Sequence, residues 1–324
     1  MWDYVLQNPA EVIRGLTRVP AVNLALAAVI TVGILWRRRR GGQGVGADRR
    51  EERVLALAAF GVLLVYVVEY VLRGFVLDLV NIVEWWQYAT PVVAAVVALA
   101  AVLITLLHGP VPERPMSPSS RRTWLTFSSR AGLGAACGSF LGLVAVTVAA
   151  GSASSADTDG RFILLDLVAP NAAMDAVQPW FYGWSFGVPV LIALAALAVV
   201  TAMALRANAA RPFLRPETVL AEQASRRIVA AAVVRIATAG ILLSLAGALR
   251  FVERAGTIGT VTFADTGRSY ETPWQWAEFA VIGGWLSPVL DVVAFVSLLL
   301  FAARLVPSPT RRSSLLRTEV RAVR

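Results

Sequence analysis

Residues 19–40 read VPAVNLALAAVITVGILWRRRR, and this stretch decides the fold class. The run from Val19 to Trp36 carries no charge, and four arginines, Arg37 to Arg40, follow it directly. A helix needs about 20 apolar residues to cross the roughly 30 Å of a bilayer's hydrocarbon core. A secretory signal carries its positive charge before the apolar run, whereas here the charge comes after it. We therefore expect an uncleaved membrane anchor whose N-terminus lies outside.

Six further apolar segments along the chain are also long enough to span a bilayer. Together they predict an all-α fold, a polytopic transmembrane helix bundle with seven spans, in which three helical hairpins follow the first anchor helix. Residues 1–18 are typical of an amphipathic helix in the outer interface, and residues 305–324 form a basic cytoplasmic tail. The predicted spans are 19–36, 54–74, 90–108, 131–150, 185–206, 228–250 and 277–304.

The distribution of arginine predicts the orientation of these spans. The segments 37–53, 109–130, 206–227 and 304–324 carry 22 arginines and 7 acidic residues, whereas the opposite side carries 7 arginines and 13 acidic residues. Cytoplasmic loops are rich in basic residues, so we expect the N-terminus outside and the C-terminus in the cytoplasm. An anionic inner leaflet attracts such loops. The net charge of +9 then requires no nucleic acid as a partner.

The composition excludes several classes of site. All 30 basic residues are arginine, and the chain has one histidine, His108, and one cysteine, Cys137. This excludes a disulfide framework, a Cys/His zinc site, a bis-histidine haem and an iron–sulfur cluster, as well as a retinal Schiff base, which needs lysine. We expect no cofactor, no resident metal and no enzymatic activity. Chains this rich in Ala, Val and Arg are typical of high-GC bacteria, so we expect a bacterial inner membrane.

Two of the loops between spans predict small elements of their own. Residues 255–273 have the pattern of a β-hairpin, and residues 162–168 form a short helix or strand at the interface.

One face of the second predicted span is polar. Tyr66, Glu69, Tyr70 and Arg73 follow the spacing i, i+3, i+4 and i+7, which places them on one side of a helix. Glu69 and Arg73 are spaced to pair with each other near the outer end, where the pair would serve helix packing. The alternative is that the stripe lines a solvated vestibule.

Asp291 is the most informative single residue, because it is a carboxylate about 20 Å from either end of the last span at ~1.5 Å per residue. Pro288, one turn earlier, removes a backbone N–H and favours a broken or kinked helix. A carboxylate beside a helix break is the pattern of ion and substrate sites in transporters. The structural alternatives are that Asp291 pairs with Arg235 of the preceding span, or that it forms a hydrogen bond with the backbone loosened by Pro288.

Eight of the ten tryptophans are predicted near the outer interface. An aromatic belt at the headgroup level explains them. Because the inner side has only Trp36 and Trp124, they also fit an outer aromatic surface that stacks a lipid headgroup, a quinone ring or a partner helix. The candidates for that surface are Trp85, Trp86, Trp180, Trp184, Trp274, Trp276 and Trp285.

The fourth predicted span carries a glycine face. Gly134, Gly138 and Gly142 recur every fourth residue, and small residues at this spacing let helix backbones approach closely in lipid. We expect a tight crossing with a neighbouring helix of the same chain; a homodimer seam is the alternative.

Two functions are compatible with these features. The first is a small transporter or ion-coupled carrier with a midplane site at Asp291 and Pro288 and an outer gate at Glu69 and Arg73. The second is a non-catalytic scaffold or accessory subunit of a larger membrane complex, which the glycine face and the one-sided tryptophans favour.

Overall fold

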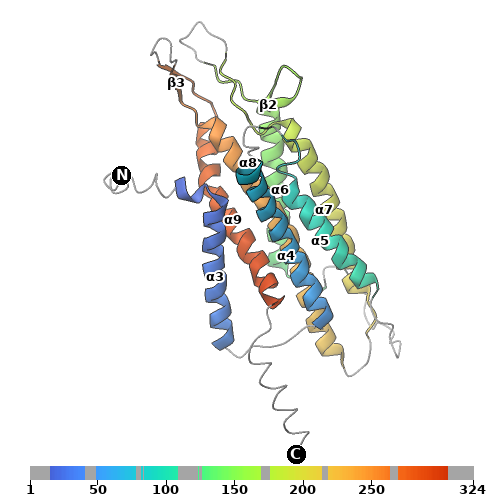
Figure 1. The fold of residues 1–324 in the computed structure, drawn as a ribbon. Coiled ribbons are helices and arrows are strands. Elements are labelled where there is room, and N and C mark those ends of the chain that lie inside the picture. Colours follow the sequence, from blue (N-terminus) through green and yellow to red (C-terminus); the bar gives the residue numbers. More distant parts are fainter. Residues whose placement is uncertain are drawn as a thin grey trace, which may run out of the picture.

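The computed structural model describes residues 15–40, 49–77, 82, 84–108, 123, 126–168, 176–213, 218–262 and 269–305. This part of the chain is mostly helical, and seven of its helices are long and apolar enough to cross a membrane (Figure 1). They coincide with the seven apolar segments of the sequence. The helices are α3 (Pro20–Arg40), α4 (Arg49–Val71), α5 (Thr90–Leu107), α6 (Arg130–Ala153), α7 (Trp184–Ala210), α8 (Val219–Gly256) and α9 (Ala277–Ala302).

Several helices extend past the apolar segments that predict them. α8 has 38 residues and includes Arg226 and Glu253 near its two ends. A prediction based on apolar segments ends before such charged residues, although Arg and Glu are good helix formers and the helix continues through them. α4 continues into a π-helical turn, η1 (Leu72–Val76), and α9 ends in a short 3-10 turn, η4 (Ala303–Leu305).

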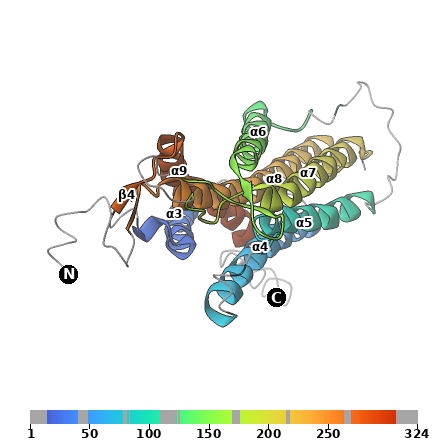
Figure 2. The ribbon, with the colours of Figure 1, turned by 90° about the horizontal axis from the view of Figure 1, so that it is seen from above.

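α8 is the central helix of the bundle. It packs against α4, α5, α6, α7 and α9, and seen from above it lies between α9 and α7 (Figure 2). Its apolar stretch is 78% buried, against 39% or less for the other six. A helix that is apolar all round belongs in such a central position. α3 lies at the edge of the bundle, where it packs on α9.

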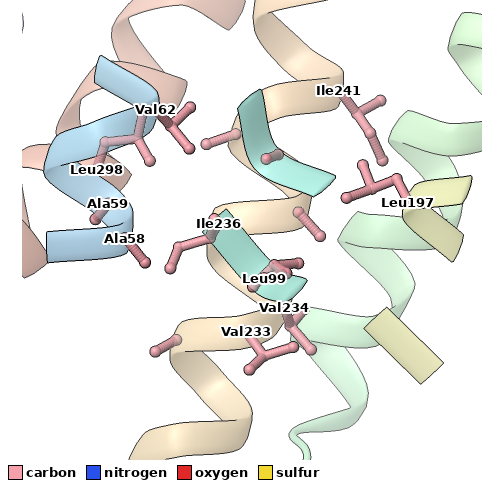
Figure 3. Close-up of a cluster of buried hydrophobic side chains, with 14 of the residues drawn as sticks. Ala58, Ala59, Val62, Leu99, Leu197, Val233, Val234, Ile236, Ile241 and Leu298 are labelled. Carbon is pink, nitrogen blue, oxygen red and sulfur yellow. The ribbon is translucent and has the colours of Figure 1, made fainter. Parts of the chain in front are cut away.

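The hydrophobic core forms where α4, α5, α7 and α9 surround the middle of α8. Figure 3 shows side chains from all five helices meeting there. Leu99 of α5, Leu197 of α7 and Ile236 of α8 are each at most 1% exposed, and Val62 of α4 and Leu298 of α9 are fully buried.

α5 and α8 approach each other closely at Gly240. A Cβ atom built on Gly240 would lie 2.7 Å from the Cβ of Ala95 and 3.0 Å from the carbonyl oxygen of Pro91. Only a residue without a side chain allows the two backbones to come this close.

The glycine face of α6 does not form the tight crossing that its spacing predicts. A Cβ at Gly134 or Gly138 would meet nothing within 4 Å, and one at Gly142 would meet only Leu245, at 3.7 Å. α6 instead approaches α7 through its opposite face, where Cβ atoms built on Gly151 and Gly187 would lie within 3 Å of Trp184 and Thr147, respectively. The prediction of an intramolecular crossing is therefore wrong for Gly134 and Gly138.

Two small antiparallel hairpins stand at one end of the bundle, which we call the hairpin end (Figure 1). The first pairs β1 (Ser155–Ala156) with β2 (Phe162–Leu164), and the second pairs β3 (Thr260–Thr262) with β4 (Ser269–Glu271). A hairpin was predicted at residues 255–273, and a short helix or strand at residues 162–168, where the structure has the strand β2. The described chain is therefore helical with two small hairpins rather than purely α-helical.

Charged side chains tie the helices together at the opposite end. Glu51 of α4 forms an ion pair with Arg211 and accepts a hydrogen bond from the hydroxyl of Ser225 at 2.8 Å. Glu52, the next residue of α4, forms a second ion pair, in which its Oε1 atom lies 3.3 Å from Nη1 of Arg304. Most of the predicted N-terminal interfacial segment and the basic tail beyond Leu305 lie outside the described residues.

Candidate polar site at the hairpin end

Asp291 joins three helices inside the bundle. The residue is fully buried on α9, and its Oδ2 atom forms an ion pair with Arg250 of α8 and accepts a hydrogen bond from Asn23 Nδ2 of α3 at 3.0 Å. Its other oxygen, Oδ1, is buried and has no hydrogen-bond partner among the described residues. A buried carboxylate is stable only when it is paired, so Arg250 and Asn23 are what hold the charge of Asp291 in place.

The sequence suggested Arg235 as the partner of Asp291, and this interpretation is wrong. The guanidinium of Arg235 lies over the ring of Phe301, 5.7 Å from its centroid. α8 and α9 run antiparallel (Figure 1), and Gly284 packs against the carboxylate of Glu253. This register places Arg235 beside the C-terminal end of α9. It places Arg250 about one helical turn along the bundle from the level of Asp291.

The predicted helix break at Pro288 does not occur, because α9 runs without interruption through Pro288. Proline cannot donate to the carbonyl four residues earlier, which belongs to Gly284. The hydroxyl of Ser287 donates to that carbonyl at 3.3 Å. A neighbouring side chain thus supplies the donor that the proline lacks.

Glu69 and Arg73 do not form the predicted ion pair. Arg73 pairs with Glu84, in the segment before α5, and Glu69 accepts a hydrogen bond from the hydroxyl of Thr90 at 3.1 Å. The prediction assumed α-helical spacing, but the α-helix ends at Val71 and Arg73 belongs to the π-helical turn η1. The wider turn changes the direction of the Arg73 side chain.

The polar stripe of α4 nevertheless lines a cavity of about 260 Å³ at the hairpin end. The cavity lies between the end of α4, the start of α5, the last turns of α8 and the first residue of α3. Its charged and aromatic lining residues are Glu69, Arg73, Arg250, Arg254, Tyr66, Tyr70, Tyr88 and Phe251.

Positive charge dominates the lining of this cavity. Three arginines and one glutamate line it. Two of these arginines have acidic partners, Glu84 for Arg73 and Asp291 for Arg250, but neither acid lines the cavity. The third arginine, Arg254, is exposed and forms no ion pair with any residue that the structure describes. A space lined in this way favours an anion.

Aromatic side chains form a rigid wall of the cavity around Tyr88. Its ring stacks on Phe251 at 5.5 Å and meets Tyr182 edge-on at 5.3 Å, and its carbonyl accepts a hydrogen bond from the Ser244 hydroxyl at 2.7 Å. Burial raises the pKa of the Tyr88 phenol, so the hydroxyl stays neutral.

A second ion pair lies close to Asp291 but outside the cavity. Glu253 of α8 is 2% exposed, and its carboxylate lies 2.7 Å from the guanidinium of Arg18, just before α3. Together with the bond from Asn23 to Asp291, this pair fastens the start of α3 to α8 and α9.

The tryptophans predicted to form an outer surface fall into several separate contacts. Trp184 lies against Gly151, and Trp274 against Gly256, so both serve helix packing. The others are at least 40% exposed. These are Trp85, Trp86, Trp180, Trp276 and Trp285.

Trp85 and Trp86 contact each other edge-on at one end of a second hollow, an apolar groove of about 980 Å³. α5 forms the floor of this groove, and α4 and α7 form its walls. The groove continues along α5 to Thr105, so it runs along the apolar part of the bundle.

The sequence analysis missed Tyr88, Phe251 and Arg254 of the cavity lining, and it also missed three residues around Asp291. Asn23 is one polar residue within an apolar segment, Arg250 was assigned to the end of the sixth span, and Glu253 was placed in the following loop. An antiparallel alignment of α8 and α9 across residues 257–276, which connect them, would have brought Arg250, but not Asn23, toward Asp291. No protein-family model, curated protein or solved structure matches the chain.

Proposed function

We propose that the chain is a multi-pass membrane carrier that binds a small organic anion in the cavity at the hairpin end. The observation that supports this proposal is the position of Arg250. It lines the cavity, and its ion-pair partner Asp291 lies behind it, fully buried. A guanidinium has five N–H donors, so Arg250 has donors to offer an anion that enters the cavity.

The lining also favours one class of anion. Arginine binds carboxylates and related oxyanions in a bidentate way, and Tyr66 and Tyr88 add hydroxyl groups to the wall. Tyr70 and Phe251 supply apolar ring surface. A small anion with an aromatic or aliphatic body fits this combination better than inorganic phosphate, which would leave the rings without an apolar partner.

The proposed setting is the inner membrane of a bacterium, with the N-terminus outside and the C-terminus inside. The arginine-rich segments would then face the cytoplasm, as the positive-inside rule requires. In this orientation the cavity opens toward the exterior, and the carrier takes its anion from there.

Uptake into proteoliposomes tests the proposal. The substrates are radiolabelled benzenesulfonate, benzoate and inorganic phosphate, with uncharged benzamide as the neutral analogue. We expect saturable uptake of the two aromatic anions above empty liposomes, and no carrier-dependent uptake of benzamide. Absence of saturable uptake for all three anions would overturn the proposal.

Two arginine variants of α8 make the test specific to the cavity. Arg254 and Arg227 are both exposed on α8, but only Arg254 lines the cavity. We expect Arg254→Gln to raise KM about tenfold, which corresponds to one charge-assisted hydrogen bond. The matched change Arg227→Gln should leave KM unchanged.

A scaffold or accessory subunit is the second candidate function, and the outward face of α6 favours it. Gly134, Cys137, Gly138 and Leu141 follow helical spacing and are all exposed, with open space at both glycines. A helix of another protein, or of a second copy, could approach this face closely. Stoichiometric co-purification with another membrane protein in mild detergent, without anion uptake, would favour this function.

A further inference from the structure

The contacts of Asp291 point to a coupling ion, and this inference rests on the proposed function. We propose that the carrier moves its organic anion together with one proton, and that Asp291 takes up this proton when the anion binds Arg250. The step transfers a proton from water in the cavity to a carboxylate oxygen of Asp291. An anion with one negative charge and one proton then move as a neutral pair.

Arg250 contacts both the cavity and Asp291. It lines the cavity, and it is paired with Asp291. Its side chain is 17% exposed, whereas that of Asp291 is fully buried. An anion in the cavity therefore reaches the guanidinium without reaching Asp291, and its negative charge competes with that of Asp291 for the one positive charge of Arg250.

Asp291 loses its charged partner when Arg250 turns to the anion. Among the described residues, only Asn23 also donates to its carboxylate. A buried carboxylate with one neutral donor is unfavourable in its charged form. Protonation removes that charge, so binding of the anion and uptake of a proton favour each other.

The contact between Asp291 and Asn23 has a place for the additional proton. Oδ1 of Asp291 and Oδ1 of Asn23 are both buried acceptors without a hydrogen-bond partner among the described residues. The two side chains are already in contact through Asn23 Nδ2. A protonated carboxyl is a donor, and it would give the oxygen of Asn23 the donor that it lacks.

Four groups of the part of the chain that the structure describes lie around Asp291, from α3, α8, α9 and α4. Asn23 faces it from α3 and Arg250 from α8, and Ser287 precedes it by one turn on α9 with its hydroxyl bonded to Gly284. From α4, Tyr66 interacts with both Asp291 and Arg250. Tyr66 also lines the cavity, so its hydroxyl lies on the path that a proton would take.

The acidic groups farther away are engaged elsewhere. Glu69, one turn from Tyr66 on α4, accepts the hydrogen bond from Thr90. Glu253, one turn from Arg250 on α8, is paired with Arg18. Asp291 is therefore the acid that loses its partner when Arg250 binds an anion.

The experiment measures proton uptake on binding, with purified full-length protein in nanodiscs and a pH indicator in weak buffer. Benzenesulfonate is the probe, because it stays ionised and cannot itself take up a proton. We expect about one proton to be taken up per benzenesulfonate bound. Between two pH values at which free Asp291 is ionised, the affinity should fall about tenfold per pH unit.

The variant Asp291→Asn provides the control. It should bind benzenesulfonate without proton uptake and with an affinity that does not depend on pH. Binding to the wild-type protein without proton uptake would overturn the coupling and leave the proposed carrier intact, since Arg250 would then hold both anions at once. If neither benzenesulfonate nor benzoate binds, the proposed function itself fails, and the coupling with it. The stoichiometry of the wild-type protein decides the question even if the variant does not fold.

Discussion

Arg250 connects a polar cavity at the hairpin end with Asp291, a carboxylate that has no exposure of its own. The pair spans the interface between the central helix α8 and α9. Removing one partner of a buried pair is more costly than removing both, because it leaves one charge without compensation.

The first prediction concerns the stability that this pair contributes. Arg250→Met leaves the charge of Asp291 with only Asn23 as donor, so we expect the variant to lose about 3–5 kcal/mol of unfolding free energy. The double variant Arg250→Met/Asp291→Leu should recover most of the loss, because neither charge remains. Circular dichroism during unfolding measures both effects. A double variant that is no more stable than Arg250→Met would show that the pair does not hold these helices as described.

The second prediction concerns the glycines. Gly240→Leu should destabilise the protein by more than about 2 kcal/mol, because its side chain would meet Ala95 and the Pro91 carbonyl. Gly138→Leu is the matched control and should have little effect on the unfolding of the monomer, since its side chain enters open space. The unfolding midpoints of the two variants in detergent provide the comparison, and equal losses would contradict the packing.

The third prediction addresses the second candidate function through Cys137, the only cysteine of the chain. Cys137 is exposed between Gly134 and Gly138 on α6. If α6 forms a homodimer seam, mild oxidation in membranes should produce a disulfide-linked dimer, which Gly138→Leu abolishes. If the carrier works as a single chain, gel electrophoresis after oxidation should show only the monomer.

The fourth prediction concerns alkaline stability. Burial raises the pKa of Tyr182 to about 12, against the opposing effect of its hydrogen bond with Thr147. An unfolded tyrosine ionises near pH 10. The neutral Tyr182 phenol therefore contributes its full stabilisation of the folded state below about pH 10, and this contribution is lost as the pH rises toward 12. Tyr182→Phe should flatten the decline of stability in that range; an unchanged decline would show that Tyr182 is not its source.

The helices were the most predictable part of the fold, because each carries a long apolar run that only a helix can bury in a bilayer. The β-hairpin at 255–273 was predictable for a similar reason, since its turn and strand residues are local signals. Boundaries were less predictable: the charged ends of α8 are helical but lie outside its apolar run.

The partners within the site could not be predicted, because they depend on how helices are placed against one another. Sequence position pointed to Arg235 as the partner of Asp291, whereas the register of α8 on α9 selects Arg250. The π-helical turn at η1 redirects Arg73 from Glu69 to Glu84, and no spacing rule anticipates that turn. Asn23 lies far from Asp291 in the chain and meets it only because α3 packs on α9.

The most direct test of the account is whether an organic anion binds at Arg250. Equilibrium dialysis of radiolabelled benzenesulfonate against protein in nanodiscs compares the wild type with Arg250→Met/Asp291→Leu, the variant without the buried pair. The account predicts saturable binding of one anion per wild-type chain and loss of that binding in the folded double variant. Equal binding by the two proteins would contradict it.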